Sequence, residues 1–162
     1  MCTILNHEEN PFALKTFMRQ RDKPSKMMLN FNPQRRWLLN SPAEPMNCIS
    51  KNCQGLRQPQ SVPKLTELVR KHFPTILFLI ETRAKEPFIK NLRNKLHLEN
   101  VLIVPTINSG GGLALFWKNG VDLNVLDSSP TYIDVVVNPG MDDAWRFTGF
   151  NRNLVTANRE HS

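Results

Sequence analysis

The chain has 162 residues, of which 40% are hydrophobic, and it carries a formal net charge of +7 at pH 7. This length fits one domain with a tail, and the hydrophobic content is sufficient for a packed core. Its apolar runs are far shorter than the ~20 residues needed to cross a bilayer, its first residues lack the apolar region of a secretory signal, and its three cysteines are too few to crosslink a secreted scaffold.

We therefore expect an intracellular protein with reduced thiols and no membrane association. The positive charge favours a polyanion such as DNA as the partner, because Lys and Arg near phosphates release counterions. A basic surface without any such partner is the alternative.

Residues 1–45 differ in pattern from the rest of the chain. Their apolar residues are scattered, and prolines at positions 24, 33, 42 and 45 interrupt any helical or strand period. We expect a disordered or loosely packed basic leader, which is either solvated or in contact with nucleic acid. The orderly pattern, and with it the expected domain, covers residues 46–162.

Strand and helix alternate at the start of this domain. Residues 46–50 predict a short strand, and Ser61 and Pro63 predict the start of a helix with one apolar stripe that ends before Pro74. The unbroken apolar run 75–80 predicts a central strand that is covered on both faces. Because a helix connects these two strands, we expect them to be parallel neighbours. A second helix is expected over residues 85–96, with Phe88, Leu92 and Leu96 on its apolar side.

The second half of the domain predicts strands separated by turns. The expected strands cover residues 100–104, 112–118, 121–127, 132–137 and 144–150. Asn119-Gly120 predicts a hairpin, because this dipeptide tolerates the positive φ angles of a type I′ turn. The run Ser109–Gly112 leads into a strand, which indicates a tight turn or a close contact and not a phosphate-binding loop. The sequence thus predicts an α/β fold with the order βαβα followed by an antiparallel meander.

Two polar residues follow the predicted parallel strands. Asn52 comes just after the first strand, and Glu81 lies at the carboxyl end of the second. Ligands of open α/β sheets bind at the carboxyl ends of the strands, so both side chains are expected at one edge. A carboxylate there suits Mg²⁺. Two simpler interpretations stay open: Glu81 as an exposed acid paired with Arg83, and Asn52 as a turn-forming residue before Gly55.

The order of these segments resembles the endonuclease/exonuclease/phosphatase superfamily, and in particular the N-terminal half of the apurinic-endonuclease-like domain of plant LINE-type retrotransposons. The segments that carry the resemblance are residues 46–56, 76–83, 109–118, 133–137, 145–150 and 156–162. The resemblance implies a two-sheet α/β sandwich that hydrolyses phosphodiester or phosphomonoester bonds with Mg²⁺ or Mn²⁺. It also implies that Glu81 binds the metal, that Asn52 forms hydrogen bonds within the site, and that Arg83 orients neighbouring acids.

The chain departs from the family pattern at several positions. Gln54 replaces a basic residue of the first motif, and Asn151 stands where the family places an active-site tyrosine. The family's later Asp-x-Asn and Asp-His motifs have no counterpart before Ser162. We therefore expect a truncated endonuclease-like domain that is inactive by itself, with an uncovered sheet face through which it could self-associate. Sequence alone leaves open whether the chain is an enzyme or a noncatalytic nucleic-acid-binding or structural remnant, and whether it enters the nucleus.

Overall fold

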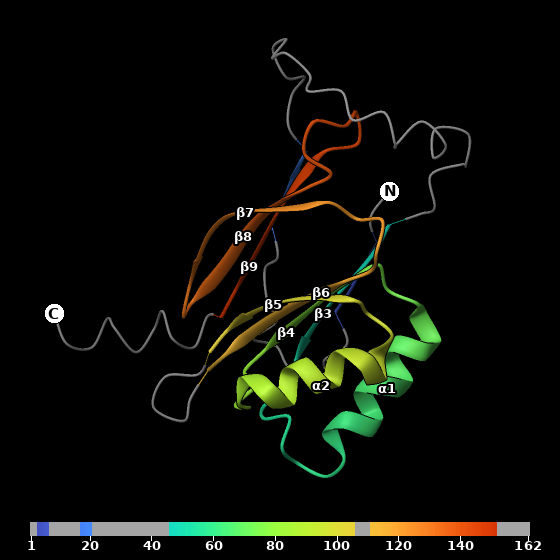
Figure 1. Ribbon diagram of the computed structural model, residues 1–162, viewed down its shortest axis with the longest axis vertical. Coiled ribbons are helices and arrows are strands. Elements are labelled where there is room, and N and C mark those ends of the chain that lie inside the picture. The colour runs from blue at the N-terminus through green and yellow to red at the C-terminus, as the bar shows by residue number, and fades with distance from the viewer. Residues whose placement is uncertain (1–2, 7–16, 21–45, 106–110, 152–162) are drawn as a thin grey trace, which may run out of the picture.

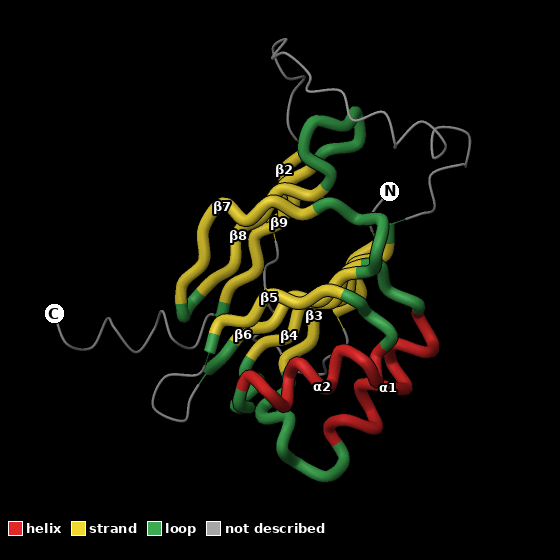
Figure 2. The backbone as a smooth tube through the Cα atoms, in the orientation of Figure 1, coloured by secondary structure: helices red, strands yellow, loops and turns green. Residues whose placement is uncertain are grey.

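The computed structural model of the protein describes residues 3–6, 17–20, 46–105 and 111–151. These residues form two β-sheets and two helices arranged in three layers (Figure 1). The helices cover one face of the first sheet, and the second sheet covers the other face (Figures 1 and 2). The α/β class and the two-sheet sandwich expected from the sequence are confirmed.

The first sheet has five strands in the order β1-β3-β4-β6-β5. These are β1 (Thr3–Asn6), β3 (Asn47–Asn52), β4 (Ile76–Ile80), β5 (Asn100–Val104) and β6 (Leu113–Trp117). β4 lies at the centre, and all five of its residues are buried, as its unbroken apolar sequence predicts. β3 and β4 are parallel neighbours, so the predicted pairing is confirmed. β6 pairs antiparallel with both β4 and β5.

Two helices follow the parallel strands: α1 (Ser61–His72) and α2 (Glu86–Leu96). Each ends at a residue in the left-handed conformation, Phe73 with φ 46° and His97 with φ 53°. The buried face of α2 consists of Ile89, Leu92 and Leu96. The prediction that Phe88 belongs to this face was wrong, because Ile89 takes the core position and Phe88 is 39% exposed. Neither helix of the described residues has the length and apolarity to span a bilayer.

The second sheet is antiparallel, with the strand order β2-β9-β8-β7. Its strands are β2 (Phe17–Gln20), β7 (Leu123–Ser129), β8 (Tyr132–Val137) and β9 (Trp145–Phe150). The last three form the meander that the sequence predicts. A bulge interrupts the β7–β8 register between Val125 and Asp127.

The Asn119-Gly120 turn connects the two sheets. The sequence predicted a hairpin here, and a turn does form, with the Val121 N–H donating to the Lys118 carbonyl. The strands on either side do not pair, because β6 lies between β4 and β5 whereas β7 lies at the edge of the second sheet. The hairpin prediction was wrong because turn chemistry is local, whereas the partner of β6 is decided by packing against the apolar β4.

Residues 1–45 contribute two strands that the sequence did not predict. β1 pairs parallel with β3, and β2 pairs antiparallel with β9, so each extends a sheet. The expected leader thus contains strand structure at Thr3–Asn6 and Phe17–Gln20. The rest of that leader lies outside the described residues, as does the 156–162 segment of the resemblance.

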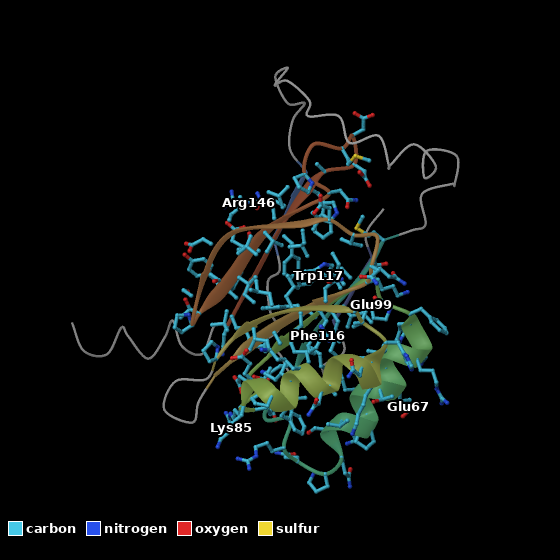
Figure 3. The ribbon with its side chains drawn as sticks, viewed as in Figure 1. Glu67, Lys85, Glu99, Phe116, Trp117 and Arg146 are labelled. Atoms are coloured by element: carbon cyan, nitrogen blue, oxygen red, sulfur yellow. The ribbon has the colours of Figure 1, made fainter. Side chains whose placement is uncertain are left out.

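The layer between the sheets is an apolar core. Phe78 of β4 meets Phe147 of β9 edge to face, with ring centroids 5.5 Å apart. Figure 3 shows Phe116 directed toward the helices and Trp117 directed between the sheets, which is the alternation expected of a strand covered on both faces. The face of the first sheet that was expected to be uncovered is thus covered by the second sheet. The second sheet therefore occupies the face through which self-association was expected.

Candidate functional site

The candidate site lies where the parallel strands β3 and β4 end. In the observed register Asn52 is the partner of Ile80, so Glu81 follows one position beyond it. The Cys53 N–H donates to the Ile80 carbonyl at 2.8 Å and continues the pairing past the end of β3. The parallel pairing brings the ends that carry Asn52 and Glu81 to one edge of the sheet, as the sequence predicted.

Glu81-Thr82-Arg83 leaves the sheet in an unusual conformation. Glu81 has φ 53° and Arg83 has φ 44°, so two residues with side chains adopt left-handed backbone within three positions. Such angles are uncommon outside glycine, and strained backbone of this kind clusters at functional sites. Glu81 is only 5% exposed, and Thr82 is fully buried. Glu81 is therefore not the exposed acid of the simpler interpretation.

The Glu81 carboxylate is paired with Arg83. The Arg83 guanidinium donates from Nη2 to Glu81 Oε2 at 3.3 Å. The Arg83 side chain is 50% exposed, while that of Glu81 is 7% exposed. A buried carboxylate is costly without a charged or hydrogen-bonding partner. Arg83 provides that partner and also presents a cation to the solvent at the site.

Asn52 forms the turn that follows β3. Its side-chain Oδ1 accepts a hydrogen bond from the Gln54 N–H at 3.0 Å, which is the geometry of an Asx turn. Gln54 is exposed and has φ 48°. The turn-forming interpretation of Asn52 is thus confirmed. The amide oxygen keeps a second lone pair, so this role does not conflict with a further contact.

Asn151 lies at the same end of the molecule. The Trp145 indole N–H donates to Met46 Sδ at the start of β3, and Phe147 contacts Phe78 in the middle of β4. β9 therefore runs in the same direction as β4, and Asn151, directly after β9, lies toward the end that carries Glu81. Asn151 is 2% exposed, and its backbone N–H donates to the Thr131 carbonyl at 2.7 Å. The structure places this residue toward the site.

Two glycine-containing segments form backbone hydrogen bonds to Glu81-Thr82-Arg83, one on each side. The sequence analysis did not predict this role. The Gly55 and Leu56 N–H groups donate to the carbonyls of Glu81 and Thr82 at 2.9 and 2.8 Å. The carbonyls of Gly112 and Gly111 each accept a hydrogen bond at 3.1 Å, from the N–H groups of Thr82 and Arg83 respectively. The glycine run at 109–112 was the signal in the sequence, but we interpreted it as a turn or a close contact.

The oxygen donors at this edge fit one mode of magnesium binding. Among the described residues, no group of three or more His, Cys, Asp or Glu side chains could hold a metal ion. Mg²⁺ is commonly held by one or two carboxylates, with water and substrate phosphates completing the shell. The Glu81 carboxylate and the Asn52 amide oxygen are compatible with that mode. They do not amount to an all-protein metal site.

A second ionic group lies away from this edge, on the outer face of the second sheet (Figure 3). Arg146 donates from Nε to Asp134 Oδ1 at 2.8 Å and from Nη2 to Oδ2, and Thr148 donates from Oγ1 to Oδ1 at 2.9 Å. The Arg146 guanidinium, helped by Thr148, lowers the pKa of the Asp134 carboxyl. All three residues are partnered across neighbouring strands, which indicates a structural role.

Sequence comparisons identify no relative for this chain. No protein-family model matches it, and no curated protein is similar to it.

Proposed function

We propose that residues 46–151 form part of a divalent-metal-dependent phosphodiesterase domain of the DNA endonuclease type. One observation carries the proposal: the parallel ends of β3 and β4 place Asn52 and a buried Glu81 at one edge, with Glu81 in a left-handed conformation and paired with Arg83. This is the position at which α/β sheets bind ligands.

Each residue has a role that follows from its geometry. Glu81 holds Mg²⁺ or Mn²⁺, which when bound neutralises phosphate charge and polarises the phosphoryl oxygen. Arg83 holds the Glu81 carboxylate, and its half-exposed guanidinium is available to a phosphate. Asn52 fixes the turn after β3 through its hydrogen bond to Gln54 and thereby shapes the edge.

The described residues supply little of the proton-transfer chemistry that hydrolysis needs. They contain no cluster of acids or histidines around Glu81. Residues that act together in catalysis are strongly non-additive, so one metal ligand without a general base gives at most slow turnover. We therefore propose that the 162-residue chain alone is inactive or nearly so.

A noncatalytic nucleic-acid-binding role is the second candidate. It is favoured by the net charge of +7 and by basic residues in the last turns of both helices: Arg70, Lys71, Arg93 and Lys95. Such residues supply sequence-independent affinity for phosphates. This candidate needs neither a metal nor Glu81.

Glu81→Ala tests the first candidate. We expect Mn²⁺, titrated into the purified chain and followed by electron paramagnetic resonance of the free ion, to bind at least tenfold more weakly to this variant. Any nicking of supercoiled plasmid with Mg²⁺ should be slow in the wild type and absent in the variant and in EDTA.

Glu86→Ala is the matched control, because Glu86 is an exposed acid paired with Lys90 on α2. It should leave both measurements unchanged. If Glu81→Ala binds Mn²⁺ as tightly as the wild type does, the proposed metal site is wrong. Plasmid binding without metal-dependent nicking or Glu81-dependent Mn²⁺ binding would favour the noncatalytic role.

A further inference from the structure

The positive backbone φ angles of the described residues fall into two groups. Five have ordinary explanations: Phe73 and His97 end helices, and Gly120, Asn138 and Gly140 lie in turns between strands. The others lie in three segments at the end of β4: Gln54, Gly55, Glu81, Arg83, Gly111 and Gly112. In this second group, Gln54 belongs to the Asx turn of Asn52, whereas no helix end accounts for the others.

Hydrogen bonds join these three segments to one another. The loop 54–56 donates two N–H groups to the carbonyls of Glu81 and Thr82 on one side. On the other side, Gly111 and Gly112 accept from the N–H groups of Arg83 and Thr82. The middle segment is therefore fixed along both edges of its backbone, and we name the two flanking segments, 54–56 and 111–112, the backbone clamp.

We propose that the glycines of the backbone clamp are positioning residues for the Glu81 carboxylate. Regular strand alternation would direct Glu81 to the helix side of the sheet, where Leu77 and Leu79 are buried. The left-handed φ of Glu81 breaks that alternation, and the hydrogen bonds of the clamp hold the residue in this conformation. Gly55, Gly111 and Gly112 adopt the required positive φ angles without steric cost.

This inference rests on the proposed function, because Glu81 is taken as the metal ligand. The clamp also lies close to Arg83, the residue that pairs with Glu81. A Cβ added at Gly55 would lie 3.7 Å from Arg83 Cδ, which is an ordinary van der Waals contact. Gly55→Ala therefore perturbs the clamp through backbone conformation, since φ at Gly55 is +106°, and not through a clash. Gly120→Ala is its matched control, with φ +93° and no atom within 4 Å, in the turn between the sheets.

The test compares Mn²⁺ binding and amide hydrogen exchange in these two variants. We expect Gly55→Ala to weaken Mn²⁺ binding at least fivefold and to speed exchange of the Leu56 and Thr82 amides at least tenfold. Gly120→Ala, which carries a similar conformational strain, should leave both unchanged. Gly111→Ala, which strains the opposite side of the clamp, should behave like Gly55→Ala.

Each contrary result has a distinct meaning. If Glu81→Ala abolishes Mn²⁺ binding while Gly55→Ala and Gly111→Ala bind as the wild type does, the clamp is overturned and the proposed function stands. If Mn²⁺ binding does not depend on Glu81, both are overturned. Should the glycine variants fail to fold, wild-type exchange still decides: Thr82 and Arg83 amides that exchange as fast as those of an unstructured peptide would overturn the clamp.

Discussion

At the scale of single residues, the strand-end position of Glu81 follows from the local sequence, whereas its burial and backbone conformation depend on tertiary contacts. The polar residue after the apolar run 76–80 is visible in the sequence and predicts a strand end. Its burial and its left-handed backbone depend on neighbours far away in the chain, at positions 55, 111 and 112. No local propensity favours a left-handed glutamate, so the sequence could identify the residue but not its conformation.

Thr82 makes a prediction at the same scale. Its Oγ1 is buried and finds no hydrogen-bond partner among the described residues. A buried hydroxyl without a partner costs about 1–3 kcal/mol of desolvation. Thr82→Val keeps the branched shape and removes that hydroxyl, so we expect the free energy of unfolding to rise by about 1 kcal/mol, as measured by urea titration.

Thr75→Val is the control for this change. Thr75 Oγ1 accepts a hydrogen bond from the Asn47 N–H, at 3.3 Å, so its removal should lower stability. If Thr82→Val destabilises the protein as much as Thr75→Val does, the Thr82 hydroxyl has a partner in solution.

At the scale of elements, patterns in the sequence predicted most helices and strands to within a few residues. β8 has the predicted bounds, α1 begins at Ser61 and ends before Pro74 as predicted, and β4 begins one residue later than predicted. Periodicity succeeds here because burial on one or both faces selects apolar residues at fixed spacing. It failed at Phe88 because Phe88 and Ile89 are adjacent apolar residues, and only the neighbours of α2 decide which of them faces the core.

The Asp134 carboxyl links β8 and β9 and makes stability depend on pH. Arg146 lowers its pKa in the folded state, so this contact stabilises the fold above the unfolded pKa, which is about 3.9, and is lost as pH falls through the folded pKa. Asp134→Asn removes the charge. We expect the stability difference between wild type and variant to be largest near pH 6 and to shrink below pH 4, as measured by urea unfolding.

A second variant separates the charge from the geometry of this contact. Thr148→Val removes one hydrogen bond to Asp134 but leaves Arg146 in place. Its stability difference from wild type should therefore vary less with pH. A difference for Asp134→Asn that stays constant between pH 6 and pH 3 would contradict the lowered pKa.

At the scale of the whole molecule, one glycine lies close to a side chain of the opposite sheet. A Cβ added at Gly149 of β9 would lie 2.5 Å from Cε1 of Phe78, whose ring is fully buried. Neither sheet can move away without opening the core between them. We expect Gly149→Ala to lower the free energy of unfolding by about 1–3 kcal/mol, as overpacking of a close-packed interior does.

The cause can be isolated with a second substitution. Phe78→Leu makes room opposite Gly149, so the double variant should be more stable than the sum of the two single effects predicts. Simple additivity in urea unfolding would mean that Gly149 and Phe78 are not in contact.

The sequence by itself determined the α/β class, the parallel pairing of β3 with β4, and the edge at which Asn52 and Glu81 lie. These follow from local apolar patterns and from the rule that a helical connection joins parallel strands. Only the tertiary structure decided that β6 and β7 belong to different sheets, that β1 and β2 complete those sheets, and that glycines hold Glu81 in a left-handed conformation. Those outcomes depend on contacts between distant segments, and no local period records them.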